Sequence, residues 1–229
     1  MPRSILTVQE VAESLHLSLR EVERMAEEKI LPAQRVKGAW QFRAGEVWNW
    51  IITNMRVLPD QRDKDRHPKA SGGPLLVSTL KPEGVELDHS AKTKASVLRE
   101  LARLAGEVSS SIDPASLADA LSQREAQSST ALDHGVAVPH PLRPLYSDGP
   151  VIVAARTIQP IVFGERSGGL TDLFFMVCCP NHVDHLLYLG RLCRLLVEEH
   201  VRLTLRSAPD PHSFVDIVHI AEAELCDQN

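Results

Sequence analysis

The stretch from residue 57 to residue 74 most constrains how this chain of 229 residues can fold. It is polar, charged and rich in proline and glycine, so it holds too little apolar surface to fold alone. We therefore expect a flexible linker at 57–74, between a small N-terminal domain, 1–56, and a larger C-terminal domain, 75–229. The larger segment is long enough to bury a sizeable core of its own.

Composition excludes several classes of protein. With 43% hydrophobic and 24% charged residues, the chain is typical of a water-soluble globular protein. Its apolar runs are shorter than the roughly 18 residues that cross a bilayer, and its N-terminus lacks a signal-peptide core. We expect a cytoplasmic protein without a membrane segment. Residues 1–70 carry a small net positive charge and the rest a net negative charge, and neither is strong enough to reveal a partner.

The four cysteines do not form a spaced framework. Cys178 and Cys179 are adjacent within an apolar run that we expect to be a strand, so strand alternation would send them to opposite faces. Free thiols, buried or half-buried, in a reducing cytoplasm are the expected state.

The N-terminal segment predicts two capped helices. Thr7 precedes Glu10 by three residues, and Ser18 precedes Glu21 by the same spacing, as a capping box requires. Two short helices joined by a tight turn form a helix-turn-helix. Strands at 34–37 and 40–43, with a turn at Gly38 between them, and a last helix at 44–52 would complete a small winged unit.

Three short patterns link this segment to a known family. Leu6-Thr-x-x-Glu-Val-Ala12, Leu31-Pro-Ala-x-Arg-Val-x-Gly38 and Trp40-x-Phe42 resemble the MerR/excisionase-like winged helix family. The resemblance implies DNA contacts from basic residues of the second helix and the hairpin: Arg20, Arg24, Arg35, Lys37 and Arg43.

The second helix departs from that pattern, since glutamates outnumber basic residues along it. Carboxylates near phosphate oxygens oppose the ionic attraction that dominates duplex affinity. A protein-contact or homodimerisation role for this domain therefore stands as an open alternative to DNA binding.

The C-terminal segment contains the motif Gly135-Val-Ala-Val-Pro-His140. It places one imidazole after an apolar, extended run that ends in proline, which fixes its own φ and biases the preceding residue toward extended geometry. A neutral imidazole nitrogen is a nucleophile near pH 7 and can accept a phosphoryl group. We expect a stiffly supported ring that is exposed to solvent.

Several motifs in order resemble one family over residues 75–225. Arg124-Glu125, Ser129-Thr130 and the His140 motif resemble the phosphorylation site of the fructose/mannitol-type enzyme IIA proteins of the phosphotransferase system, which include the nitrogen-regulatory IIA proteins. A strand and helix within 81–104, a strand at 172–177 and a helix at 184–192 extend the resemblance. Helices that alternate with short β-rich runs indicate an α/β domain, with a mixed sheet flanked by helices.

The resemblance also implies roles for particular residues. His140 would be the nucleophile, His185 a neighbouring imidazole that holds a phosphate oxygen, and Arg124 a planar cationic fork for phosphate. Ser129 and Thr130 would add hydroxyl donors to the phosphate. The donor would be an HPr-like phosphocarrier protein, and neither a metal nor another cofactor is implied.

Two other interpretations of these residues remain at this stage. His185 lies among leucines of an amphipathic helix, so a half-buried structural histidine is one alternative. His182 and His185, with Cys178 and Cys179 nearby, could instead form a metal cluster. Adjacent thiols disfavour this, because zinc sites prefer cysteines separated by about two to four residues.

The whole chain suggests regulation more than sugar uptake, because it holds neither a transporter membrane domain nor a recognisable IIB acceptor site. Our hypothesis is a regulator whose DNA-binding-like domain or partner protein responds to phosphorylation of His140. The alternatives are a transport component that passes phosphate to a separate IIB protein, and an interaction protein without phosphoryl transfer.

Overall fold

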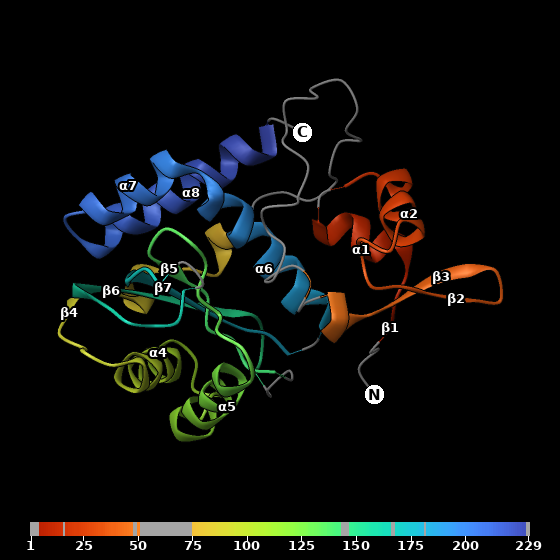
Figure 1. The fold of residues 1–229 in the computed structure, drawn as a ribbon. Coiled ribbons are helices and arrows are strands. Elements are labelled where there is room, and N and C mark those ends of the chain that lie inside the picture. The colour runs from red at the N-terminus through yellow and green to blue at the C-terminus, as the bar shows by residue number, and fades with distance from the viewer. Residues whose placement is uncertain are drawn as a thin grey trace.

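The computed structural model describes residues 5–15, 17–47, 50, 75–142, 147–165, 168–180 and 182–227 (Figure 1). The expected linker, 57–74, lies outside these residues, so the domain boundaries stay predictions. None of the described helices is long and apolar enough to cross a membrane.

The N-terminal unit is a small winged helix-turn-helix. Helices α1 (Val8–Leu15) and α2 (Leu19–Glu27) are followed by the hairpin of β2 (Gln34–Val36) and β3 (Ala39–Arg43). The short strand β1 (Ile5–Leu6) pairs antiparallel with β3, which gives the sheet order β1-β3-β2. Residues 44–47 are helical, and the structure describes only part of the helix expected at 44–52.

Both predicted capping boxes are present. The Thr7 amide donates to Glu10 Oε2 at 2.8 Å, and the Glu10 amide donates back to Thr7 Oγ1 at 3.2 Å. Ser18 and Glu21 make the same reciprocal pair at the start of α2. These side chains satisfy amides that the first turn of a helix leaves without partners, which is why each helix begins where the sequence predicts.

The C-terminal unit is built on a four-stranded sheet in the order β4-β6-β7-β5. The central strands β6 (Val151–Ile161) and β7 (Thr171–Cys178) pair antiparallel, whereas β4 (Val85–His89) and β5 (Val136–Ala137) run parallel to their neighbours. The sheet is therefore mixed, as expected. Two 3-10 turns precede β4: η2 (Leu76–Ser78) and η3 (Pro82–Gly84).

Helices cover both faces of this sheet (Figure 1). Helices α4 (Lys94–Val108) and α5 (Pro114–Gln127) lie on one face. Helices α6 (His182–Val197), α7 (Glu199–Ser207) and α8 (Pro211–Asp227) lie on the other. The predicted fold class, α/β with a mixed sheet flanked by helices, is confirmed.

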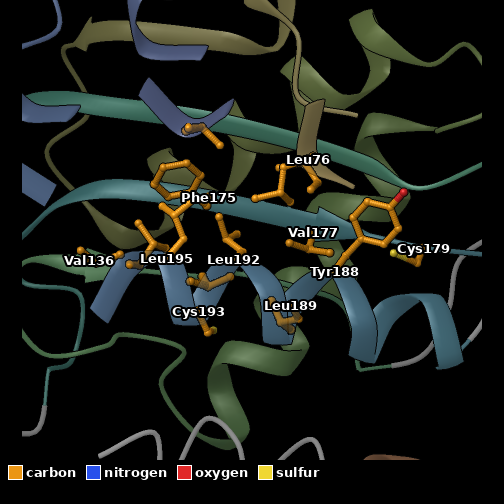
Figure 2. Close-up of a cluster of buried hydrophobic side chains, with 14 of the residues drawn as sticks. Leu76, Val136, Phe175, Val177, Cys179, Tyr188, Leu189, Leu192, Cys193 and Leu195 are labelled. Carbon is orange, nitrogen blue, oxygen red and sulfur yellow. The ribbon is translucent and has the colours of Figure 1, made fainter. Parts of the chain in front are cut away.

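Alternation along β7 divides the core into two clusters. Phe174 and Cys178 pack with the α4 and α5 side, whereas Phe175 and Cys179 pack with the α6 side (Figure 2). The two adjacent thiols are buried on opposite faces, as the sequence predicts. Burial of each large apolar side chain contributes about 1.5–3 kcal/mol, so both helical layers are held firmly to the sheet.

A buried carboxylate of α8 fixes the start of the C-terminal unit. Glu222 is 0% exposed and accepts the backbone N–H groups of Leu75 and Leu76, each at 2.8 Å, and of Val77 at 3.3 Å. Arg191 of α6, which is 2% exposed, lies 3.4 Å from the same carboxylate. The pair joins α6, α8 and the chain entering the domain.

Replacement of Glu222 should be costly, because Glu222→Ala leaves Arg191 buried without its carboxylate and removes the acceptor of three amides. We expect the free energy of unfolding to fall by about 3 kcal/mol or more in urea titrations. Glu224→Ala is the matched control, since Glu224 is exposed on the same helix. Its effect should stay within about 0.5 kcal/mol, and equal losses in both variants would refute this role.

Candidate functional site

Three segments that are distant in sequence bring the predicted histidines and arginine together. Arg124 lies in the last turn of α5, His140 follows β5, and His185 lies in the first turn of α6. Arg124 Nε donates to His140 Nε2 at 2.9 Å. The centroids of the two imidazole rings are 5.6 Å apart, with an interplanar angle of 56°.

The hydrogen bonds of His140 define its tautomer. Nδ1 lies 2.8 Å from the carbonyl oxygen of Val138, which can only accept, so Nδ1 carries the hydrogen. Nε2 then presents a lone pair, and it accepts the N–H of Arg124. The arrangement holds a neutral imidazole whose nucleophilic atom is Nε2.

The surroundings keep this ring neutral. Burial lowers the pKa of His140 well below its ordinary value, and the neighbouring His185 and the positive charge of Arg124 lower it further. The hydrogen bond to Val138 opposes these effects. Burial also lowers the pKa of Arg124, against the opposing charge of Glu125.

Backbone hydrogen bonds hold the motif on the edge of the sheet. The Val138 amide donates to the Thr130 carbonyl at 3.0 Å, and the Val177 amide donates to the Pro139 carbonyl at 3.1 Å. Since proline cannot donate, Pro139 takes part in this ladder through its carbonyl alone. The extended run that was expected to support His140 is therefore present.

Gly135 directly precedes β5 and has a left-handed conformation, with φ 81°. A Cβ atom there would collide with the guanidinium of Arg206 and lie 2.9 Å from Asp172 Oδ1. Arg206 binds both Asp172 and the His134 carbonyl at 2.7 Å, and the Gly135 amide donates to Glu165 at 2.7 Å. These tertiary contacts fix the backbone at the start of the motif. They leave no room for a Cβ atom at position 135, so only glycine fits there.

The predicted hydroxyl donors are engaged with protein acceptors. The Thr130 hydroxyl donates to Glu125 at 2.6 Å, and the Ser129 hydroxyl donates to the Phe163 carbonyl at 3.3 Å. Glu125 also accepts from Lys94 Nζ at 2.9 Å, and its side chain is only 3% exposed. Contacts to phosphate from Ser129 and Thr130 stay predictions. The role of Glu125 as an acceptor was not predicted, and its position beside Arg124 is the one feature of the sequence that points to it.

The expected exposure of the imidazole is wrong. His140 is 1% exposed, Arg124 is 2% exposed and His185 is 8% exposed. The physical reason is tertiary packing: Arg124 contacts the ring directly, and α6 brings a second ring beside it. A local motif predicts backbone geometry, but it does not report what packs over the side chain that it presents.

The basic residues predicted for DNA contact all lie on the N-terminal unit and are exposed. Arg20 and Arg24 lie on α2, and Arg35, Lys37 and Arg43 lie on the hairpin. Arg24 is 3.9 Å from a glutamate one turn later, so part of the charge of this helix is paired.

The arrangement of the cysteines does not support a metal cluster of His182 and His185 with Cys178 and Cys179. Cys178 and Cys179 are buried in different clusters on opposite faces of the sheet, and burial raises the pKa of the Cys179 thiol. Thiolate is the form that binds zinc, so both observations count against a site here. The side chain of His182 lies outside what the structure describes.

Within the described ranges, another group has ligand atoms close enough for a metal: Glu86, His89 and Glu100, all within 4.8 Å of one another. Arg103 donates to both carboxylates, and the Glu86 carboxylate also accepts from His89 at 2.9 Å. An ion-pair network already accounts for this group.

Comparisons with known proteins place the chain. Residues 78–220, more than half of its length, match the model of the family described as "Phosphoenolpyruvate-dependent sugar phosphotransferase system, EIIA 2". Residues 5–54 match a helix-turn-helix domain. The fold and the family match are those of a phosphotransferase-system component. The chain belongs to the EIIA type-2 family and carries an N-terminal helix-turn-helix domain.

Individual relatives agree with this assignment. A nitrogen regulatory protein of Bradyrhizobium diazoefficiens is 29% identical over 150 residues, which cover 65% of this chain and 97% of that protein. A fructose-specific EIIA component of Haloferax volcanii is 30% identical over 145 residues, which cover 62% of this chain and 94% of that protein.

A solved structure supports the fold. The crystal structure of nitrogen regulatory protein IIA-Ntr from Neisseria meningitidis matches with a TM-score of 0.58 and 25% identity, and the match covers 62% of this chain and 98% of that one.

The lowered pKa of His140 makes stability depend on pH. Below about pH 6.5 the unfolded chain binds more protons than the folded one, so the free energy of unfolding falls as pH drops. Urea unfolding between about pH 7.5 and about pH 5.5 measures this dependence. As pH falls, the free energy of unfolding of wild type should drop more steeply than that of His140→Gln, by up to about 1.4 kcal/mol per pH unit. The exposed His200 provides the control variant His200→Gln, which should keep the wild-type slope. Identical slopes in all three proteins would contradict the expectation.

Proposed function

We propose that this protein is a cytoplasmic regulator of the phosphotransferase system, phosphorylated reversibly on His140 Nε2 by an HPr-like histidine phosphocarrier. The observation that carries the proposal is the pair of hydrogen bonds that locks the Nδ1–H tautomer and aims Arg124 at Nε2. Arg124 is thereby placed at the atom that would bind phosphorus, where a guanidinium can pair with phosphate oxygens.

The proposed transfer is a direct exchange between two imidazoles. The lone pair of His140 Nε2 forms the new N–P bond while the N–P bond of the donor breaks, and the donor imidazole leaves with that electron pair. Nδ1 keeps its hydrogen and donates to the Val138 carbonyl throughout, which stabilises positive charge on the phosphorylated ring. Arg124 and His185 would stabilise the negative charge on the transferred oxygens.

Two findings support a regulatory role over transport. The chain joins its EIIA unit to a helix-turn-helix domain, which provides a route to transcription. The Bradyrhizobium relative is named a nitrogen regulatory protein. Phosphorylation of His140 would then control a DNA-bound or protein-bound state of the N-terminal domain.

A second candidate is a sugar-transport component that passes phosphate to a separate IIB protein. The Haloferax relative is named a fructose-specific EIIA component, which favours it. A solution structure of Escherichia coli mannitol enzyme IIA in complex with phosphorylated IIB shares the fold, with a TM-score of 0.51.

Phosphoryl transfer tests the central claim. Purified protein, incubated with phosphorylated carrier, should gain one phosphoryl group that intact-mass spectrometry detects near neutral pH, where phosphohistidine survives. His140→Ala should gain none, and Arg124→Gln should react about a hundredfold more slowly, since glutamine lacks the positive charge that stabilises the transferred phosphoryl group. His200→Ala, at an exposed histidine, should behave as wild type.

The same experiment separates the candidates. Phosphoprotein that discharges rapidly onto a purified IIB protein would favour transport, and stable phosphoprotein would favour regulation. An unphosphorylated wild type beside an active control EIIA would refute both and leave an interaction protein without phosphoryl transfer.

The DNA proposal has its own test. If the wing contacts the duplex backbone, Arg35→Ala/Lys37→Ala should weaken binding to the upstream region of its own gene. It should also reduce the slope of log affinity against log salt by roughly 0.9 for each phosphate that the variant no longer neutralises. Fluorescence anisotropy over a salt series measures both. Glu23→Ala, at an exposed glutamate of α2, is a control that should not weaken binding. An affinity that ignores salt and the double change would favour a protein-contact or dimerisation role.

A further inference from the structure

Helix α6 is buried on more than its sheet-facing side. Figure 2 shows Tyr188 and Leu192 of α6 directed toward the strands, among Leu76 and Val177. Gly190 lies about 160° around the helix from Leu192, because each residue turns an α-helix by about 100°. Gly190 is nevertheless buried. Another element must therefore cover the side of α6 that faces away from the sheet.

The neighbours of Gly190 on that side of the helix are also partly covered. Leu187 and Arg194, three residues before it and four after it, are only partly exposed. Burial lowers the pKa of Arg194 to about 10, with help from the nearby charge of Arg191. A guanidinium on a free outer surface would stay in water and keep its ordinary pKa.

The N-terminal domain supplies a helix at this place. Helix α1 packs against α6, and one continuous cluster of buried apolar side chains runs from Val11 in α1 to Leu189 in α6. In Figure 1 the end of α6 remote from α7 lies beside the N-terminal domain. Glycine, which lacks a Cβ, allows two helices to approach closely. Contact between α1 and α6 is consistent with the burial of Gly190.

The same end of α6 carries His185. Its ring lies 5.6 Å from that of His140, and both rings are buried. A protein phosphate donor must bring its phosphorus atom within bonding reach of His140 Nε2, so this wall of the site has to move. Helix α6 packs against both the sheet and α1, so movement of its His185 end would disturb both contacts.

The covalent linker keeps the two units close to each other. The expected linker at 57–74 joins the two units, and the backbone that follows it is tied to Glu222, which also pairs with Arg191 of α6. A connection of this length gives an effective concentration on the order of millimolar, so a modest interface suffices for docking. The basic residues of α2 and the wing stay exposed in the docked arrangement.

We propose that the helix-turn-helix domain docks through α1 on the Gly190 side of α6 and controls access to His140. Docked, it holds His185 closed against His140; undocked, it allows the phosphate donor to reach Nε2. The inference rests on the proposed function of His140 as phosphoryl acceptor. Coupling of this kind is reciprocal at equilibrium, so phosphorylation would favour release of the domain by the same factor. This is the route by which a phosphoryl group reports to the DNA-binding-like module.

Gly190→Gln tests the proposal in the full chain. The added side chain obstructs the seam with α1, points away from the sheet, and suits a helix better than glycine does. Val197→Gln is the matched control, since Val197 is 51% exposed at the far end of the same helix. The probe is diethyl pyrocarbonate, a small reagent that acylates accessible imidazoles, with modification of each histidine followed by peptide mass spectrometry.

We expect His140 in Gly190→Gln to react about tenfold faster than in wild type, which corresponds to about 1.4 kcal/mol lost from docking. The exposed His200 and His212 are internal references, and their rates should stay constant in all proteins. Backbone amides of α1 should exchange hydrogen faster in the same variant. Val197→Gln should match wild type in every readout.

Unchanged His140 reactivity in Gly190→Gln would overturn the proposal, whether or not α1 exchanges faster. Should the glutamine variant fail to fold, Gly190→Ala carries the test with a smaller increase in the same direction, and no increase there refutes it. Failure of the proposed function is a separate outcome, because it appears as lack of transfer from the carrier while the reactivity of His140 still reports docking.

Discussion

The hydrogen-bonded chain from Arg124 through the His140 ring to the Val138 carbonyl is the interaction on which the site depends. A carbonyl on one side and a guanidinium N–H on the other leave the imidazole one tautomer and one orientation. Burial strengthens both bonds and keeps the ring uncharged. The backbone beneath it is equally constrained, because the segment from Gly135 to Pro139 is held by β7 and by the contacts around Arg206.

Helix α6 connects this site to the rest of the molecule. One side packs on β7, its first turn brings His185 beside His140, and Arg191 reaches Glu222 on α8. The helix also packs against α1 of the N-terminal domain. Packed interiors are close to incompressible, so a change at one side of such a helix is felt at the others. The element that completes the site is thus also the one that the second domain touches.

The comparison with relatives shows where this protein differs. The match to the Bradyrhizobium nitrogen regulatory protein covers 97% of that protein but 65% of this chain. The helix-turn-helix unit at 5–54 lies before the EIIA match at 78–220, so the chain joins an EIIA domain to a second module. Under the proposed docking, burial of His140 has a physical meaning, because the added module would control when the site opens.

Local patterns determined much of this protein. Capping boxes predicted where α1 and α2 begin, and strand alternation predicted that Cys178 and Cys179 lie on opposite faces. The order of the motifs predicted the mixed α/β fold and the residues that meet at His140. These features depend on neighbours in sequence, or on a resemblance that local motifs carry. Exposure of the ring, the engagement of Thr130 by Glu125 and the contact of α1 with α6 were decided only by tertiary structure. Each depends on segments far apart in the chain, whose approach is set by packing and not by any local pattern.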